Sequence, residues 1–384
     1  MPLYHALGTA LVTEEELAVK QATGALETFL QDAETRPDAA ELEFSTGNVT
    51  IRGISPGLEV ARGERVAFQE VGLGKPLTVE IRHVYTGKYP VAGGLFTPQS
   101  KGLLVTSALK NLVTTGAATR ALNYLQADSP AYGTIRDPRA TEQGTPLVYY
   151  SPAVVDSALT LTLELGFRDF ERRYFDWFSQ VFTHAAGLPV FVTQAPILIV
   201  AGTLVSIARE VAARFFEKPP VFAATESLAF DRPGAEKLVA GFKLIADEPL
   251  KQEFLVEHEV DEGGILVNKQ SRQRYGGDLP YMVISVDGRE MKAYDQFTPL
   301  AATAALLESY FNISGGDEKP LDPLLEALTL YNDWNFRKQA DGLQQEIGQL
   351  DPKNDKDKIA LRQAAYEAAV ANIRKAELKP TKGK

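Results

Sequence analysis

The chain of 384 residues contains no cysteine, only four histidines and only three methionines. Without cysteine there can be no disulfide framework, no thiolate zinc site and no cysteine nucleophile. The histidines are too far apart in sequence to give the spacing of a zinc-protease helix. We therefore expect His5, His83, His184 and His258 to be structural, and His258, in the acidic segment EHEVDE, is the one candidate exception.

Basic residues are fewer than acidic ones, with 40 Lys and Arg against 50 Asp and Glu, so the formal net charge is −10. Such a charge disfavours nucleic acid as a partner. Residues 317–384 hold twelve acids and twelve bases, which places the whole negative excess in the first 316 residues. The last thirteen residues carry five bases and one acid, and we interpret them as a solvated helix end and tail.

The first sixteen residues lack a basic segment followed by a long apolar stretch, which a cleaved secretory signal requires. We therefore expect a cytoplasmic protein. Hydrophobic residues make up 45% of the chain, enough to build buried cores, and the length allows two or three domains.

One uncharged run of twenty-four residues, 185–208, is long enough by count to cross a bilayer, which takes about 20 apolar residues. Pro189 and Pro196 interrupt this run, because a helix rarely continues through the residue before a proline. We expect a short strand over 188–194 and a helix over 196–216.

The segment before the run has aromatic residues at helical spacing, with Asp169 placed to cap its start. The sequence therefore predicts a central hydrophobic helical pair over 168–218, buried in a soluble core. Leu204 and Ile207 should then be buried against protein.

Strand-like segments rich in β-branched residues lie on both sides of this pair. Residues 40–166 contain seven of them, including the alternating LTLTLEL, and we expect a short helix over 117–125. This spacing favours an antiparallel sandwich. Residues 219–292 should add one hairpin around Pro233-Gly234 and another around the DEGG segment 261–264, with EFLVEHEV and ILVNKQ as its strands. A further hairpin turn signal lies at Asp287-Gly288.

Helices are expected at both ends of the chain. The first covers 13–31, with Thr13 and Glu16 in capping-box spacing. Another covers about 299–311. The last two, 323–349 and 356–378, meet at an Asp-Pro turn and should be antiparallel neighbours that pack on the β body or on another subunit.

The predicted fold is α+β, with an antiparallel β-sandwich-like body, a buried central helical pair and a C-terminal antiparallel helical hairpin. The two β-rich regions are either separate domains or one interrupted sheet system, and we expect the second. The predicted parts are an N-terminal helix and arm (1–37), a β-rich domain (38–167), the helical pair (168–218), a second β-rich region with a closing helix (219–315) and the helical hairpin with a basic tail (316–384).

The candidate metal ligands are three nearby carboxylates, those of Glu257, Glu259 and Asp261. At the tip of a hairpin their oxygens suit Ca²⁺ or Mg²⁺. The alternative is a solvated acidic face neutralised by basic residues close in sequence, namely Lys251, Lys269, Arg272 and Arg274. Apart from this weak candidate we expect no cofactor.

Three other patterns match known motifs only in part. Ser107 and Lys110 have the spacing of a serine-lysine nucleophile, but they lie in a predicted strand, which would separate the two side chains. Residues 72–75 resemble a phosphate-binding loop superficially and are better interpreted as a turn. Residues 351–357 mimic the opening of a calcium loop without its glycine and glutamate, so we expect a turn between helices.

Three functional hypotheses follow. The first is a non-catalytic protein-interaction or assembly protein that contacts a protein partner or itself through the C-terminal helices or a sheet edge. The second is a conditionally membrane-active protein that uses the 169–217 helical pair. The third is a hydrolase with a dispersed acidic site near Glu257.

Overall fold

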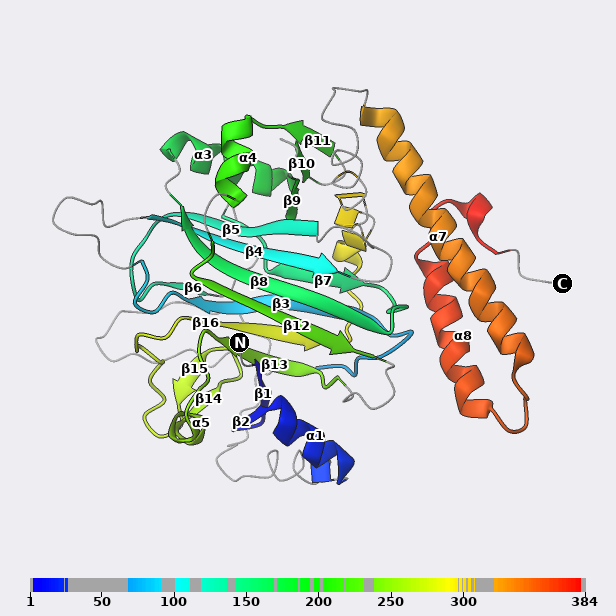
Figure 1. Ribbon diagram of the computed structural model, residues 1–384, viewed down its shortest axis with the longest axis horizontal. Helices are drawn as coiled ribbons and strands as arrows, with labels where there is room; N and C mark the ends of the chain where they lie inside the picture. The colour runs from blue at the N-terminus through cyan, green and yellow to red at the C-terminus, as the bar shows by residue number, and fades with distance from the viewer. Residues whose placement is uncertain are drawn as a thin grey trace, which may run out of the picture.

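Two antiparallel sheets form the body of the protein, and a helical hairpin lies at one side of them (Figure 1). The computed structural model describes residues 3–23, 25–26, 68–90, 101–110, 119–136, 143–168, 171–185, 187–193, 197–200, 203–216, 219–230, 238–295, 297–298, 300–301, 303–304, 307 and 321–380.

The first sheet runs in the order β2-β1-β13-β16-β3-β6, and β7 pairs with the other end of β3. Its seven strands are β1 (Leu3–Leu7), β2 (Ala10–Thr13), β3 (Leu77–Tyr85), β6 (Thr134–Arg136), β7 (Leu147–Ser151), β13 (Gly241–Ala246) and β16 (Tyr281–Asp287). In its centre, β16 pairs with both β13 and β3, with Lys243 opposite Ile284 and Val79 opposite Val286.

The second sheet runs in the order β11-β10-β9-β5-β4-β8-β12. Its strands are β4 (Lys101–Lys110), β5 (Thr119–Ser129), β8 (Ala158–Arg168), β9 (Val190–Val192), β10 (Ile197–Val200), β11 (Thr203–Ser206) and β12 (Phe222–Ala229). Strands from both β-rich zones of the sequence therefore lie in both sheets.

The main core lies between the two sheets and confirms the sandwich-like arrangement. The predicted alternation in LTLTLEL is borne out by four leucines of β8, each 1% exposed: Leu159, Leu161, Leu163 and Leu165. From the first sheet the same core receives Leu77, Val79, Ile81, Met282, Ile284 and Val286. Phe297, Leu300 and Leu307, from the region of the predicted closing helix, also pack there.

The predicted helical pair is present as α3 (Arg172–Ala185) and α4 (Arg209–Phe216), which lie near β9, β10 and β11 in Figure 1. The expectation that the pair is buried is wrong in part, because the helices pack on the outer face of the second sheet with only one side of each buried. A second core joins them to that face. It contains the helical side chains of Phe178, Phe182, Val211 and Phe215 and the strand side chains of Leu104, Leu122, Val190 and Leu198.

The expected start of the second helix at Pro196 is wrong, because residues 197–206 form the hairpin of β10 and β11, with Val200 opposite Thr203. The β-branched side chains in this segment favour strands, and both faces are apolar: Ile199 faces the main core while Leu198 faces the helices. The strand expected over 188–194 is confirmed by β9.

Ile207, just before α4, is partly buried against the second core, whereas the side chain of Leu204 lies outside the described residues. Across the described residues, no helix is both long and apolar enough to span a membrane.

The short helix expected over 117–125 is also wrong, since this segment belongs to β5. Its alanine, leucine and arginine favour a helix, but β5 is paired with β4 on one side and β9 on the other. Leu122 is fully buried in this position. Tertiary pairing thus outweighs local propensity.

In the second β-rich zone the hairpin predicted around Pro233-Gly234 is wrong, because the flanking strands β12 and β13 belong to different sheets. The turn itself lies outside the described residues. The DEGG hairpin is confirmed by β14 (His258–Val260) and β15 (Leu266–Asn268). Residues before it form a helix, α5 (Gln252–Glu257), where a strand was expected.

Asp287-Gly288 does not join two strands in the described part of the chain. Its backbone instead meets the segment before β3: Gly288 N donates to Gln69 O over 3.0 Å, and Gln69 N donates to the Asp287 carboxylate over 3.0 Å.

The N-terminal helix is confirmed as α1 (Glu14–Ala22), and Thr13 and Glu16 form the predicted capping box. Short 3₁₀ helices follow at Lys292–Tyr294 and Ala376–Leu378.

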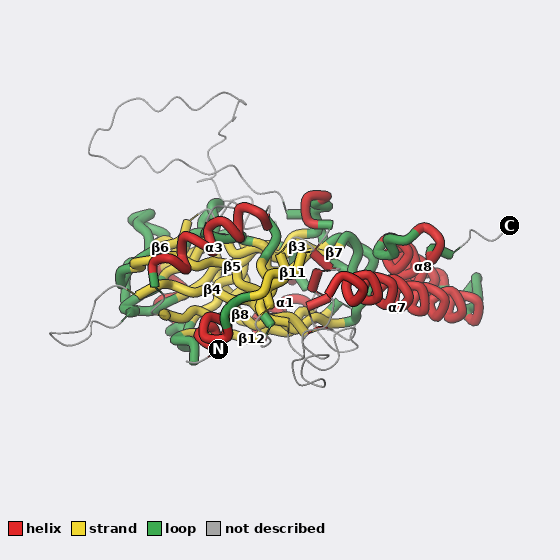
Figure 2. The backbone as a smooth tube through the Cα atoms, turned by 90° about the horizontal axis from the view of Figure 1, so that it is seen from above, coloured by secondary structure: helices red, strands yellow, loops and turns green. Residues whose placement is uncertain are grey.

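The C-terminal helical hairpin is confirmed as α7 (Leu321–Gln349) and α8 (Lys356–Ala371). In Figure 2 it extends away from one end of the strands. Of the two expected packing partners, the β body and another subunit, the hairpin contacts the β body. Asn372 Nδ2 donates to Ala153 O over 3.5 Å, and Gln339 Nε2 donates to Val155 O over 3.5 Å.

Candidate functional site

The three predicted metal ligands lie close in sequence but have different surroundings. Glu257 ends α5 and is exposed. Glu259, in β14, is buried and forms an ion pair with Arg272, one of the bases expected to neutralise it. Asp261 accepts backbone hydrogen bonds from Gly263 N at 3.0 Å and Ile265 N at 2.9 Å, so it stabilises the turn. Among the described residues, no group of three or more acidic or histidine side chains is arranged to hold a metal ion.

The other partial motifs have structural surroundings. Ser107 lies in β4 with its side chain buried, as the strand prediction required. Lys75 N donates to Gly72 O over 3.1 Å, which confirms the turn predicted over 72–75. Asn354 Nδ2 donates to the Asp351 carboxylate over 2.6 Å in the turn between α7 and α8.

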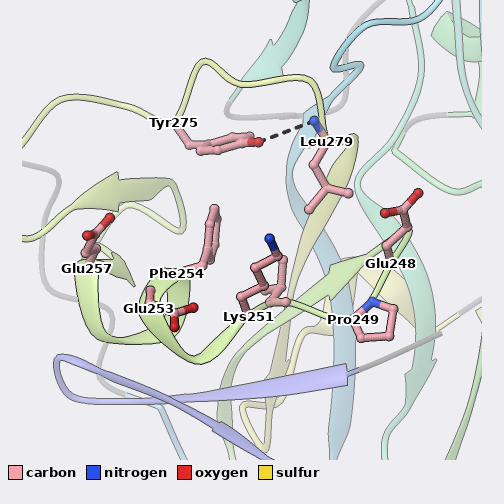
Figure 3. Close-up of a pocket in the computed structure, with 9 residues that line it drawn as sticks. Glu248, Pro249, Lys251, Glu253, Phe254, Glu257, Tyr275 and Leu279 are labelled. Carbon is pink, nitrogen blue, oxygen red and sulfur yellow. Dashed lines mark hydrogen bonds between the residues drawn. The ribbon is translucent and has the colours of Figure 1, made fainter.

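A cavity of about 260 Å³ opens on the outer side of the first sheet, next to the DEGG hairpin. The loop before α5, α5 itself and the segment leading into β16 build its wall (Figure 3). Its lining combines apolar and charged side chains: Glu248, Pro249, Leu250, Lys251, Glu253, Phe254, Glu257, Tyr275 and Leu279.

Aromatic packing fixes the cavity wall. One face of the Phe254 ring is stacked on His258, with centroids 4.1 Å apart and planes at 15°. The Tyr275 ring meets Phe254 edge to face at 5.3 Å, and its hydroxyl accepts a hydrogen bond from Leu279 N at 3.3 Å. Burial raises the pKa of Tyr275, so this hydroxyl stays protonated at neutral pH.

A second group of polar side chains lies between the two sheets, near the N-terminal strand β1. Lys243 of β13 and His5 of β1 face each other in the strand register, and Lys243 Nζ lies 2.7 Å from His5 Nδ1. His5 Nε2 forms a hydrogen bond with the carboxylate of Glu14 at the start of α1. If the lysine ammonium donates to Nδ1, the proton of the neutral imidazole is on Nε2 and is donated to the carboxylate.

Burial is the largest cause of the pKa shifts of these side chains. It lowers the pKa of Lys243 to about 8, against the favourable charges of Glu14 and Glu226. It also lowers the pKa of His5. Glu226 shares the inward face of β12 with Phe222 and Leu228, and burial raises its pKa to about 7. Perturbed pKa values mark functional sites only when a substrate can reach the groups. Because Lys243 is 1% exposed, we interpret this group of side chains as structural.

Sequence reasoning missed this group. Its signal was a single charge within the apolar segment GFKLIA, where Lys243 stands between Phe242 and Leu244. Its partner His5 is 238 positions away.

The C-terminal helices offer a different kind of surface. At its base the hairpin is held by the buried carboxylate of Asp333, which accepts from Arg374 N at 3.1 Å and Lys375 N at 2.8 Å. In the same stretch of α7, Leu330 is 39% exposed and Trp334 is 51% exposed, and Lys338 Nζ lies 5.5 Å from the centroid of the Trp334 ring.

Comparison of the chain with protein-family models, with curated proteins and with solved structures finds no match.

Proposed function

We propose that this is a non-catalytic interaction protein that associates with a second copy of itself through the exposed face of α7. The observation that carries the proposal is the exposure of Leu330 and Trp334. They are four positions apart on a helix, so they lie on the same face one turn apart. Large aromatic side chains supply much of the binding energy at protein interfaces.

The charge distribution supports a second copy as the occupant. The hairpin region, residues 317–384, is charge-balanced, while the rest of the chain carries the excess of −10. Two copies can therefore approach through their hairpins with less electrostatic repulsion than through any contact between their bodies. In an isologous contact about a twofold axis, each Trp334 ring would meet the same patch on the partner.

One alternative surface, the β12 edge of the second sheet, is less suitable. The strand β12 ends the second sheet, and Glu226 on it is directed toward the core. An inward-pointing charge on an edge strand disfavours the addition of another strand, because pairing would bury it further. The helix α7 has 29 residues and so offers a face about 43 Å long.

The experiment is light scattering coupled to gel filtration over a range of protein concentrations. The intact chain should show twice its mass of 42.0 kDa at high concentration. A Leu330→Ser and Trp334→Ser double variant should show the monomer mass, with an unchanged circular dichroism spectrum. Val19→Ser, which removes a 62% exposed apolar side chain elsewhere, is the matched control and should leave the dimer intact.

A monomer mass for the intact chain at every concentration would contradict the proposal. So would a dimer that survives in the double variant, because the contact would then lie on another surface.

A further inference from the structure

The geometry points to the cavity beside α5 as a binding site for an organic cation, specifically the guanidinium group of an arginine side chain. This site is separate from the α7 face, so the inference does not depend on self-association. It rests on the size of the cavity, its charge and its aromatic wall.

The size of the cavity limits the ligand to a small group. Pockets that bind drug-sized molecules measure roughly 300 to 1,000 Å³. At about 260 Å³ and open to solvent, this cavity suits a group as large as one amino-acid side chain, with the rest of the ligand outside.

The charge of the lining selects a cation. Glu248, Glu253 and Glu257 contribute three carboxylates and Lys251 one ammonium, so the lining carries a formal charge of −2. In the described part of the chain, none of these three carboxylates takes part in a salt bridge or a side-chain hydrogen bond. They are exposed and available to a ligand.

The aromatic wall distinguishes a guanidinium from other cations. Phe254 and Tyr275 are half-buried and line the cavity, and His258, which is not part of the lining, is stacked on one face of the Phe254 ring. A guanidinium is planar and weakly hydrated, so it can lie against an aromatic ring while its N–H groups reach a carboxylate. A lysine ammonium is a compact and strongly hydrated point charge that gains less from this arrangement.

Within this site Lys251 acts against the ligand. Its side chain lies between Phe254 and Glu248 in the close-up view, on the wall of the cavity (Figure 3). A bound guanidinium must approach this ammonium. Replacing Lys251 by a neutral residue should therefore strengthen binding by about threefold, the effect of removing one like charge at roughly 6 Å in a water-like dielectric.

The test is calorimetric titration of the full-length protein with N-acetylarginine amide. N-acetylcitrulline amide, which has nearly the same shape but no charge, is the ligand control, and N-acetyllysine amide tests the preference for a planar cation. We expect saturable binding of the arginine compound, weaker binding of the lysine compound and no binding of the citrulline compound.

Variants assign this binding to the cavity. The Glu253→Gln and Glu257→Gln double variant should weaken binding of the arginine compound about fivefold, since two exposed ion pairs contribute about 0.5 kcal/mol each. Lys251→Gln should strengthen it. Glu210→Gln, on the exposed surface of α4, removes one negative charge, as each of the two cavity substitutions does, and should not change the affinity for the arginine compound.

Absence of saturable binding by the arginine compound would overturn the inference. Equal binding of the citrulline compound would also overturn it, as would an affinity that none of the cavity variants changes.

Discussion

The side-chain nitrogens of Lys243 and His5 lie 2.7 Å apart between paired strands, although 238 positions separate the two residues in the chain. Both side chains are buried. The contact joins the N-terminal strand β1 to the central part of the first sheet, and Glu14 extends it to α1. A buried amine held in this way makes the stability of the fold depend on pH.

The first prediction concerns how the free energy of unfolding changes above pH 8. Burial lowers the pKa of Lys243 from 10.5 to about 8. Between these values the unfolded chain binds more protons than the folded chain, so the free energy of unfolding rises with pH. Lys243→Met should remove a rise of about 2 kcal/mol between pH 8 and 10, measured by urea unfolding. An equal rise in both proteins would show that Lys243 does not titrate there.

The second prediction concerns Glu226. Burial raises its pKa from 4.5 to about 7. Between these values the folded chain binds more protons than the unfolded chain, so this residue lowers stability as pH rises. Between pH 5 and 7.5, Glu226→Gln should gain about 1 to 2 kcal/mol relative to the native chain, after allowance for partial exposure.

The matched control for this second prediction is Glu210→Gln, which replaces an exposed carboxylate on α4. The lowered pKa of His5 acts in the opposite direction below pH 6.5 and is common to all three proteins, so it does not affect the comparison. A Glu226→Gln profile parallel to the native one would contradict the prediction.

Local patterns predicted the elements whose signals are local. The capping box of Thr13 and Glu16, the alternation in β8 and the last two helices depend on residues within one or two turns or strands of each other. The helix predicted over 196–216 was wrong in its first half, because apolar residues on both faces satisfy the helical period and the strand period at once. The order of strands in the sheets has no local signal, which is why β12 and β13 were wrongly paired.

The candidate sites were less predictable than the fold. Glu257 was noted from the sequence as a possible metal ligand, and it lines the cavity beside α5. Tyr275 and Leu279, on the opposite wall, follow the DEGG hairpin and approach α5 only when that hairpin packs on the first sheet. The Lys243 and His5 contact depends on a pairing between the two ends of the β body, which no sequence spacing reveals.

The third prediction concerns the attachment of the helical hairpin to the body. Gly74 has a φ of +75°, and a Cβ placed on it would lie 2.6 Å from the Cβ of Ala364. Gly74→Ala should therefore strain the turn, displace α8 and lower the free energy of unfolding by about 2 kcal/mol.

Hydrogen exchange checks the location of that third effect, since the α8 amides should exchange faster in Gly74→Ala. Gly72→Ala is the matched control, because its Cβ would meet only Lys75 Cδ, at 3.9 Å. Unchanged exchange in α8 would show that the hairpin does not rest on this turn.

The fourth prediction addresses the uncharged run at 185–208. Within it, Val190, Leu198 and Val200 are buried in the second sheet beneath α3 and α4. Exposing them to lipid would require breaking that core and the strand pairing of β9 and β10. We therefore expect the protein to stay at the bottom of a flotation gradient with neutral or anionic vesicles, with and without calcium. Flotation with either vesicle would favour the membrane-active hypothesis.

Self-association through α7 is tested most directly by the distance between two copies. Because the chain has no cysteine, a Lys338→Cys variant accepts one spin label per copy, one turn from Trp334. Pulsed electron resonance should detect a short, well-defined distance between two labels, and a Val19→Cys control should give a longer distance. An undetectable dipolar coupling for the label at position 338, at concentrations where the dimer is expected, would contradict the account.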